Sequence, residues 1–116
     1  RMGLSKSALS KFKKEVQAVI IDVNAHYMDK LTLDGIADYV GLNREYLSRL
    51  FSKETGTGLF QYINEVRMKR AGEMIRSNKQ VYIKEVAAAV GFDDPYFFSR
   101  KFKDFYGKTP SEYAEG

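Results

Sequence analysis

One segment of this chain occurs twice, and the repeat limits the folds that the chain can adopt. Residues 36–62 read IADYVGLNREYLSRLFSKETGTGLFQY, and residues 86–113 read VAAAVGFDDPYFFSRKFKDFYGKTPSEY. Gly41 and Gly91 lie fifty positions apart, and the run SRLF at 48–51 returns as SRKF at 99–102. A repeat at this period indicates one supersecondary unit used twice. The unit is a short helix, a glycine turn and a second helix, an arrangement that can place a helix in a DNA groove.

Length and composition favour a single globular domain spanning residues 1–116. The chain is 44% apolar and contains eight Tyr and eight Phe, which is enough to form a core. It has no Cys, which excludes disulfides and cysteine-ligated zinc, and no apolar run approaches the ~18 residues of a membrane helix. The absence of Cys fits a cytoplasmic protein, and the Arg1-Met2-Gly3 start leads us to expect a fragment of a longer one.

Positive charge is concentrated in two segments of the chain. The formal net charge is +4. Residues 1–16 hold five basic residues against one acidic residue, and residues 95–109 hold four against one. Clusters of this kind can be the footprint of nucleic-acid binding, although a single cluster is as often a solvated helix face.

Hydrophobic periodicity predicts an all-α fold of about seven helices, with no convincing strand. The expected helices are 7–28, 33–40, 44–55, 59–77, 83–90, 95–106 and a short last helix from residue 110. The long 59–77 helix would link two helix-turn-helix lobes, at about residues 7–56 and 82–114.

Helix ends are marked by capping residues. Thr32, Asn43 and Asp94 are good N-caps, because a side-chain oxygen can accept a hydrogen bond from an unpaired backbone N–H. The run Thr109-Pro110-Ser111-Glu112 is a capping box with Pro at the first helical position. We expect glycines to end the helices that precede each turn, at Gly41, Gly56, Gly91 and Gly107.

Apolar spacing also predicts which side chains are buried. We expect five phenylalanines in the core rather than in a base-stacking surface: Phe51, Phe97, Phe98, Phe102 and Phe105. The apolar side of the 59–77 helix would be Phe60, Ile63, Val66, Ala71, Met74 and Ile75. Asp34 and Asp38 share a helix face without an evident basic partner. The single histidine, His26, is expected on the surface, and one His cannot form a zinc site, so no metal is predicted.

The second helix of each copy has an outer face of hydrogen-bonding groups. In the first copy these are Arg44, Glu45, Ser48, Arg49 and Ser52, and in the second they are Pro95, Tyr96, Ser99, Arg100 and Lys103. Arg can bind guanine with two hydrogen bonds, Ser can donate or accept, and Glu can accept from cytosine N4. Lys and helix N-terminal amides suit phosphates.

These motifs resemble the DNA-binding domain of AraC/XylS-family transcription regulators. The second copy resembles the family in Gly91-Phe92, Tyr96-Phe97 or Phe97-Phe98, Phe102-Lys103, Gly107, Pro110 and Tyr113, and the first copy in LSRLFSKETG at 47–56. Tyr62-Ile63, Val66-Arg67 and Ala71 resemble its connecting helix. The resemblance covers roughly residues 10–114. The departures are Gly35, in place of a better helix former, and Ala114, where Arg often follows the Tyr.

The resemblance implies sequence-specific binding of double-stranded DNA for transcription regulation. Two parallel reading helices would enter adjacent major-groove segments about one turn, ~34 Å, apart. By position, base readers would be Glu45, Ser48 and Arg49 in one segment, and Pro95, Tyr96, Ser99 and Arg100 in the other. Backbone contacts would come from Asn43, Arg44, Lys53 and Lys103. RNA polymerase or a fused sensor or receiver domain would be a further partner, and the isolated domain would be monomeric.

Two other classes of function are alternatives to DNA reading. Some DNA-repair methyl acceptors carry a similar domain, but their chemistry needs a nucleophilic Cys, and no nucleophile–base pair or cofactor motif is present here; we therefore expect no enzyme activity. A helical protein-interaction module is the other alternative, although its reading faces would be stripped of Arg and Ser. Gly41 and Ser48 are seven residues apart, whereas Gly91 and Ser99 are eight apart. This difference predicts two unlike half-sites read by one asymmetric monomer.

Overall fold

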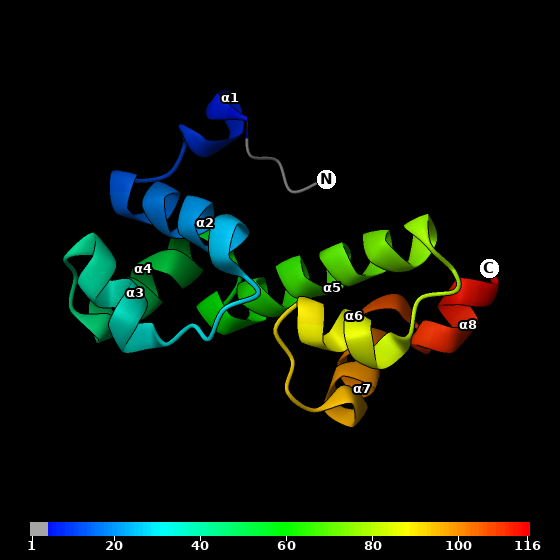
Figure 1. Cartoon of the computed structure of the whole chain (residues 1–116). Coiled ribbons are helices and arrows are strands. Elements are labelled where there is room, and N and C mark those ends of the chain that lie inside the picture. The colour runs from blue at the N-terminus through cyan, green and yellow to red at the C-terminus, as the bar shows by residue number, and fades with distance from the viewer. Residues whose placement is uncertain (1–4) are drawn as a thin grey trace. The chain divides into compact units, whose positions relative to one another are not determined.

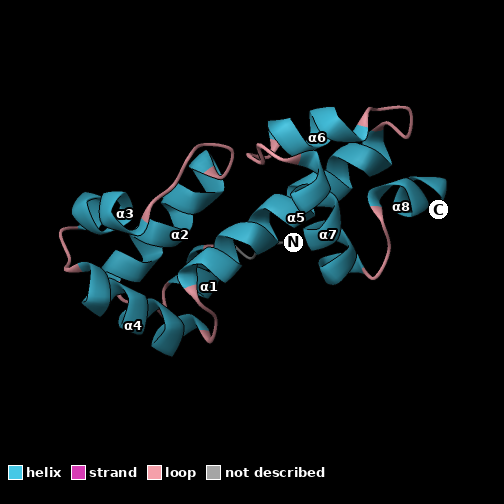
Figure 2. Cartoon of the chain, turned by 90° about the horizontal axis from the view of Figure 1, so that it is seen from below, coloured by secondary structure: helices cyan, strands magenta, loops and turns pink. Residues whose placement is uncertain are grey.

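The computed structural model describes residues 5–116 as an all-α chain, which confirms the predicted fold class (Figure 1). Its helices are α1 (Lys6–Leu9), α2 (Lys14–His26), α3 (Leu33–Val40), α4 (Arg44–Thr55), α5 (Leu59–Ser77), α6 (Ile83–Ala89), α7 (Pro95–Tyr106) and α8 (Pro110–Glu115). Within the described range, every regular element is a helix, joined to the next by a loop (Figure 2). Arg1 of the predicted basic cluster, and Met2 and Gly3 beside it, lie outside that range.

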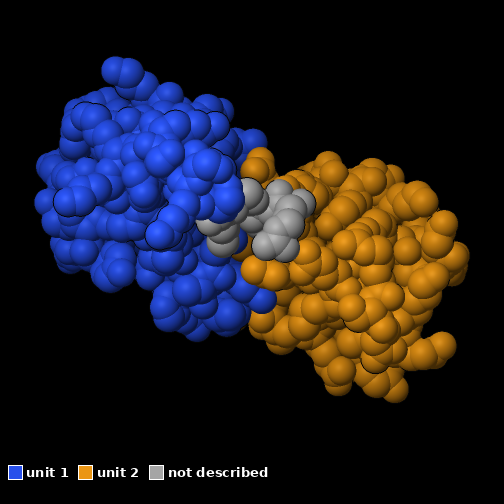
Figure 3. Space-filling model, turned by 90° about the horizontal axis from the view of Figure 1, so that it is seen from above, with its two compact units in different colours: residues 1–63 blue, residues 64–116 orange. Residues whose placement is uncertain are grey.

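The chain divides into two compact units, residues 1–63 and 64–116 (Figure 3). The first unit contains one helix-turn-helix, α3 and α4, which pack on each other and on α2. The second contains the other, α6 and α7, with α8 packed on α7. Helix α5 runs across the boundary between the units. Among residues 5–116, no helix combines the length and apolar character that a membrane span requires.

The predicted helix over residues 7–28 is two helices, α1 and α2, so that prediction is corrected. The chain turns at residues 10–13, where Lys13 has an extended backbone and its N–H donates to Glu54 Oε1 at 2.9 Å. Leu9 and Val16 are nevertheless both buried. A break of this length preserved the apolar spacing, which is why periodicity alone did not reveal it.

The core of the first unit is mainly aliphatic, with one buried amide. Its buried side chains include Val16, Val19, Ile20, Val23, Ile36, Ala37, Leu47, Leu50, Phe51, Leu59 and Ile63. Asn24 of α2 donates from Nδ2 to the Ile20 carbonyl at 2.8 Å and to the Tyr62 hydroxyl at 2.9 Å, and so ties α2 to α5. Tyr62 in turn packs against Phe51, with ring centroids 5.6 Å apart.

The core of the second unit combines aliphatic side chains with a cluster of aromatic rings. Phe98 and Phe102 are fully buried, and Phe102 stacks on Tyr106 at 4.5 Å between ring centroids. The Tyr106 hydroxyl donates to the Met68 carbonyl of α5 at 2.9 Å. Burial, with a smaller contribution from Tyr113, raises the pKa of Tyr106 to about 12. Tyr106 therefore stays neutral and anchors α7 to α5.

Gly72 of α5 is required by that anchor. A Cβ at position 72 would collide with the Tyr106 hydroxyl and lie 2.8 Å from its Cζ. The absence of a side chain is what lets the phenol lie against the helix, a close approach for which glycine is suited.

Four predicted core residues are partly exposed instead. Phe60 and Met74 of α5 are 46% and 37% exposed, while their neighbours Leu59 and Ile75 are buried. Consecutive residues on a helix point about 100° apart, so only one of each pair can face the core fully. Phe97 and Phe105 of α7 are each 39% exposed, whereas Phe51, Phe98 and Phe102 are buried as predicted.

Most predicted helix caps are present. Thr32 Oγ1 accepts from the Gly35 N–H at 3.0 Å, and Asn43 Oδ1 from the Tyr46 N–H at 3.0 Å. Asp94 caps α7 through the Tyr96 N–H, and Thr109 and Glu112 form the capping box of α8. The backbone hydrogen bond from Thr109 lowers the pKa of the Glu112 carboxyl. The starts of α3, α4, α7 and α8 were therefore readable from local chemistry, whereas α2 and α6 begin without a side-chain cap.

Candidate nucleic-acid interface

Helix α4 separates its buried and exposed residues cleanly. Leu47, Leu50 and Phe51 are buried in the first unit. The predicted readers lie on the exposed side: Glu45, Ser48 and Arg49, with Lys53 exposed one turn further on. The structure thus places the predicted readers of the first copy together on one accessible face.

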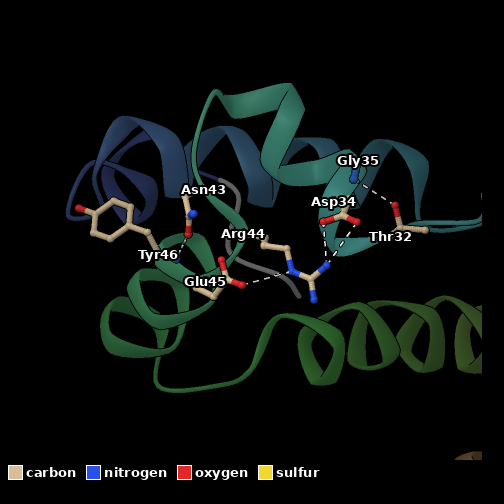
Figure 4. A network of polar contacts seen from close by, with 7 residues as sticks. All are labelled: Thr32, Asp34, Gly35, Asn43, Arg44, Glu45 and Tyr46. Atoms are coloured by element: carbon tan, nitrogen blue, oxygen red, sulfur yellow. Dashed lines mark hydrogen bonds and ion pairs between the residues drawn. The ribbon is translucent and has the colours of Figure 1, made fainter.

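The first turn of α4 carries a polar network around Arg44 (Figure 4). Arg44 Nη1 lies 3.1 Å from Asp34 Oδ1 and 3.4 Å from Asp34 Oδ2, and its Nε lies 3.6 Å from Glu45 Oε2. Arg44 therefore bridges the first turn of α3 and a predicted base reader. The expectation that Asp34 lacks a basic partner is wrong, because the turn brings together residues ten positions apart. Tyr46 points away from this network.

The two turns differ in length, as the spacing predicted. Gly41 caps α3 in the left-handed conformation, with φ 72°, and α4 starts two residues after Leu42. The shorter α6 ends at Ala89, and Gly91, with φ 104°, is followed by three residues before α7. Ala37 and Ala87 are both buried at the crossing of the two helices, as expected for small residues.

Phe92 fills the second turn and is contacted by a side chain of α5. It is 7% exposed, and the Arg67 guanidinium lies over its ring, with Cζ 5.5 Å from the centroid. Burial lowers the pKa of Arg67, and the neighbouring Asp93 opposes that shift. The partly buried Arg67 thus packs against the turn that precedes α7 through the Phe92 ring.

A hollow of about 560 Å³ opens at the start of α7. It is lined by residues from the first turns of three helices, namely Ile83, Lys84, Pro95, Tyr96, Ser99, Thr109, Pro110 and Ser111. Three predicted readers therefore share one surface, and Tyr96 among them is 79% exposed. Lys84 and Ser111 lie at the starts of the short helices α6 and α8, which the sequence indicated only as helix starts and not as individual residues.

Arg100 lies apart from that hollow, in a second one of about 270 Å³. Its lining residues are Phe97, Arg100, Lys101, Lys103 and Asp104. Arg100 Cζ is 5.6 Å, and Lys101 Nζ 5.4 Å, from the centroid of the Phe97 ring. Arg100 and Lys103, predicted as base reader and backbone contact, are thus neighbours on an exposed basic face.

Comparison with known proteins identifies this arrangement. Residues 36–116 match the family described as "Helix-turn-helix domain", a span that contains both reading helices and all of α5. The chain belongs to the AraC/XylS family. The family resemblance drawn from the motifs is thereby confirmed. AraC/XylS domains are DNA-binding domains of transcription regulators, a class that is not typically enzymatic.

Relatives of the AraC/XylS domain are similar along most of this chain. The Msm operon regulatory protein of Streptococcus mutans is 34% identical over 111 residues, which are 96% of this chain and 38% of that protein. The chain thus spans well under half of that relative. The C-terminal domain of AraT, a response regulator from Geobacillus stearothermophilus, superposes with a TM-score of 0.87 at 28% identity, covering 90% of this chain and 87% of that one. The C-terminal domain of the two-component response regulator yesN from Fusobacterium nucleatum gives 0.82 at 28% identity, covering 88% and 99%.

Proposed function

We propose that this domain regulates transcription by binding a specific site in double-stranded DNA, with α4 and α7 in adjacent major-groove segments. The observation that carries the proposal is the repeated exposed face. Ser48 and Arg49 of α4 correspond to Ser99 and Arg100 of α7, on helices whose opposite faces are buried. An exposed Ser-Arg pair at equivalent positions on both helices favours one shared role over two unrelated solvated faces.

The chemistry of the two faces supports direct reading of bases. Arg49 and Arg100 can each bind guanine O6 and N7, and Glu45 can accept from cytosine N4. Ser48 and Ser99 can donate or accept at neighbouring base edges. The exposed Tyr96 and Pro95 offer apolar surface for a thymine methyl group. The readers differ between the helices, so the site would consist of two unlike half-sites contacted by one monomer.

Contacts to the DNA phosphate backbone would position the domain without reading the base sequence. Lys53 and Lys103 are exposed cations on the two reading helices, and Arg44 and Asn43 lie at the start of α4. Arg44 would reach a phosphate while bridging Asp34 and Glu45, so its contribution would be smaller than that of a free arginine.

The whole protein would be a cytoplasmic regulator with a second domain. Two structural neighbours are named as C-terminal domains of response regulators, which supports a fused receiver domain over a sensor domain. RNA polymerase would be the further partner, as for a regulator that acts at promoters.

Competition binding tests this function. The domain is first used to select duplexes from a random pool, and the selected site then competes with random DNA at fixed salt. We expect a clear preference for the selected site and an affinity that falls steeply with salt, because phosphate contacts release counterions. A preference of no more than a few-fold would reject the proposal and favour a protein-interaction module.

A further inference from the structure

We propose that Phe97 is a positioning residue that orders Arg100 for base reading. The inference rests on the proposed DNA-binding function and assigns a role to a side chain that the sequence placed in the core. Phe97 is 39% exposed, one turn before Arg100 on α7. Its ring lies 5.6 Å from Arg100 Cζ.

The Phe97 ring is itself held in place. Its centroid is 6.0 Å from that of Phe92, which is nearly buried in the turn before α7. Phe92 packs on the buried Phe98 at 5.5 Å and carries Arg67 of α5 on its ring. A continuous series of contacts therefore runs from α5 through the turn to the exposed Arg100.

An aromatic ring can order an arginine without using its hydrogen-bond donors. The ring attracts the guanidinium charge, and all five N–H groups stay available. A long side chain that is already ordered loses less conformational freedom when it binds a base. The contact thus favours the planar, two-donor geometry that guanine recognition needs.

Arg49 of α4 provides an internal contrast. Tyr46 lies three residues before Arg49, just as Phe97 lies three residues before Arg100. The two rings are similarly exposed, at 41% and 39%. Among the described residues, however, no ring contact joins Arg49 to Tyr46, whereas Lys101 also approaches the Phe97 ring, at 5.4 Å. The ordering is therefore a property of the second reading helix.

A mutant cycle tests the proposal on the selected duplex. The base pair whose preference R100A weakens is taken as the Arg100 site, and discrimination is the ratio of affinities for that duplex and its single-base variant. Both affinities come from one protein sample, so the ratio does not depend on the folded fraction. We expect F97L to lower discrimination at this pair about two- to fivefold. F97Y, which keeps the ring, should retain it.

Two controls separate positioning from other roles. F97L should change nothing further in the R100A background, because the residue it orders is gone. F105L removes an equally exposed ring from the same helix and should leave discrimination intact.

Three outcomes would overturn the proposal: multiplicative effects of F97L and R100A, equal losses for F97Y and F97L, or unchanged discrimination in F97L. The first would mean that Phe97 meets DNA directly. A wild-type domain without sequence preference would instead reject the proposed function itself, so the two failures are distinguishable.

Discussion

The two helix-turn-helix motifs share a frame but stabilise their reading helices by different means. Around α4, a polar network of exposed side chains joins Asp34, Arg44 and Glu45 at distances of 3.1 to 3.6 Å. Around α7, the contacts are aromatic and cationic, from the nearly buried Phe92 to the half-exposed Phe97. The two copies thus share their buried positions but differ in the side-chain contacts around the predicted readers. The second motif should hold its readers more firmly, since its contacts are anchored in the core.

Removing one reader from each motif makes the strongest test of this comparison. R100A should lower discrimination by ~1–3 kcal/mol at one base pair, through loss of a two-donor contact. E45A should relax a different base pair in the other segment, and by less, because a single carboxylate acceptor is lost. Affinity measurements on all single-base variants of the selected duplex resolve both effects. If both variants relax the same base pair, the model of two unlike half-sites is wrong.

Disturbing the aromatic anchor should loosen the second motif alone. In G72A the new methyl group meets Tyr106, and overpacking of this kind costs about 1–3 kcal/mol. Alanine regains up to ~1 kcal/mol of helix propensity, so the free energy of unfolding should fall by a net ~1–2 kcal/mol. Denaturant unfolding measures the change.

Gly58→Ala is a control for an added methyl group without a collision, since no atom lies within 4 Å of its Cβ and Gly58 precedes α5. Adding Y106F to G72A should recover part of the loss, because the hydroxyl that collides is removed. A G72A domain as stable as wild type would show that Tyr106 does not depend on this close approach.

Cutting the polar network of the first motif should have the smallest effect. Asp34 and Arg44 are more than half exposed, and such pairs contribute between 0 and 1 kcal/mol. A cycle of D34N, R44Q and the double variant isolates their coupling in unfolding free energy, which should shrink further in high salt. A coupling well above 1 kcal/mol would mean that the first motif is held as firmly as the second.

Local signals in the sequence predicted much of the fold, and long-range contacts account for what they missed. Thr32, Asn43 and the Thr109–Glu112 box marked helix starts correctly, because a cap acts within three residues of itself. The turn at 10–13 escaped detection, because it preserves the apolar spacing around it. Its stabilising acceptor, Glu54, is forty-one residues away.

The candidate site shows the same division. The repeat placed the readers on exposed faces, and the extra residue in the second turn was visible in the glycine-to-serine spacing. The pairing of Arg44 with Asp34 was not, because their approach depends on how α3 and α4 cross. The partial exposure of Phe97 was also hidden, since helical spacing gives an apolar residue the same pattern in a core and at its edge.

Helix α5 contributes side chains to both cores along one unbroken backbone. Leu59 and Ile63 are buried in the first unit, and Val66, Met68, Ala71 and Ile75 in the second. Local opening of either unit would fray only one end of this helix, because its hydrogen bonds reach just four residues back. The amides of residues 64–67 hydrogen-bond to carbonyls of residues 60–63, across the boundary between the units. Their exchange with solvent should therefore follow opening of the first unit, although these residues belong to the second.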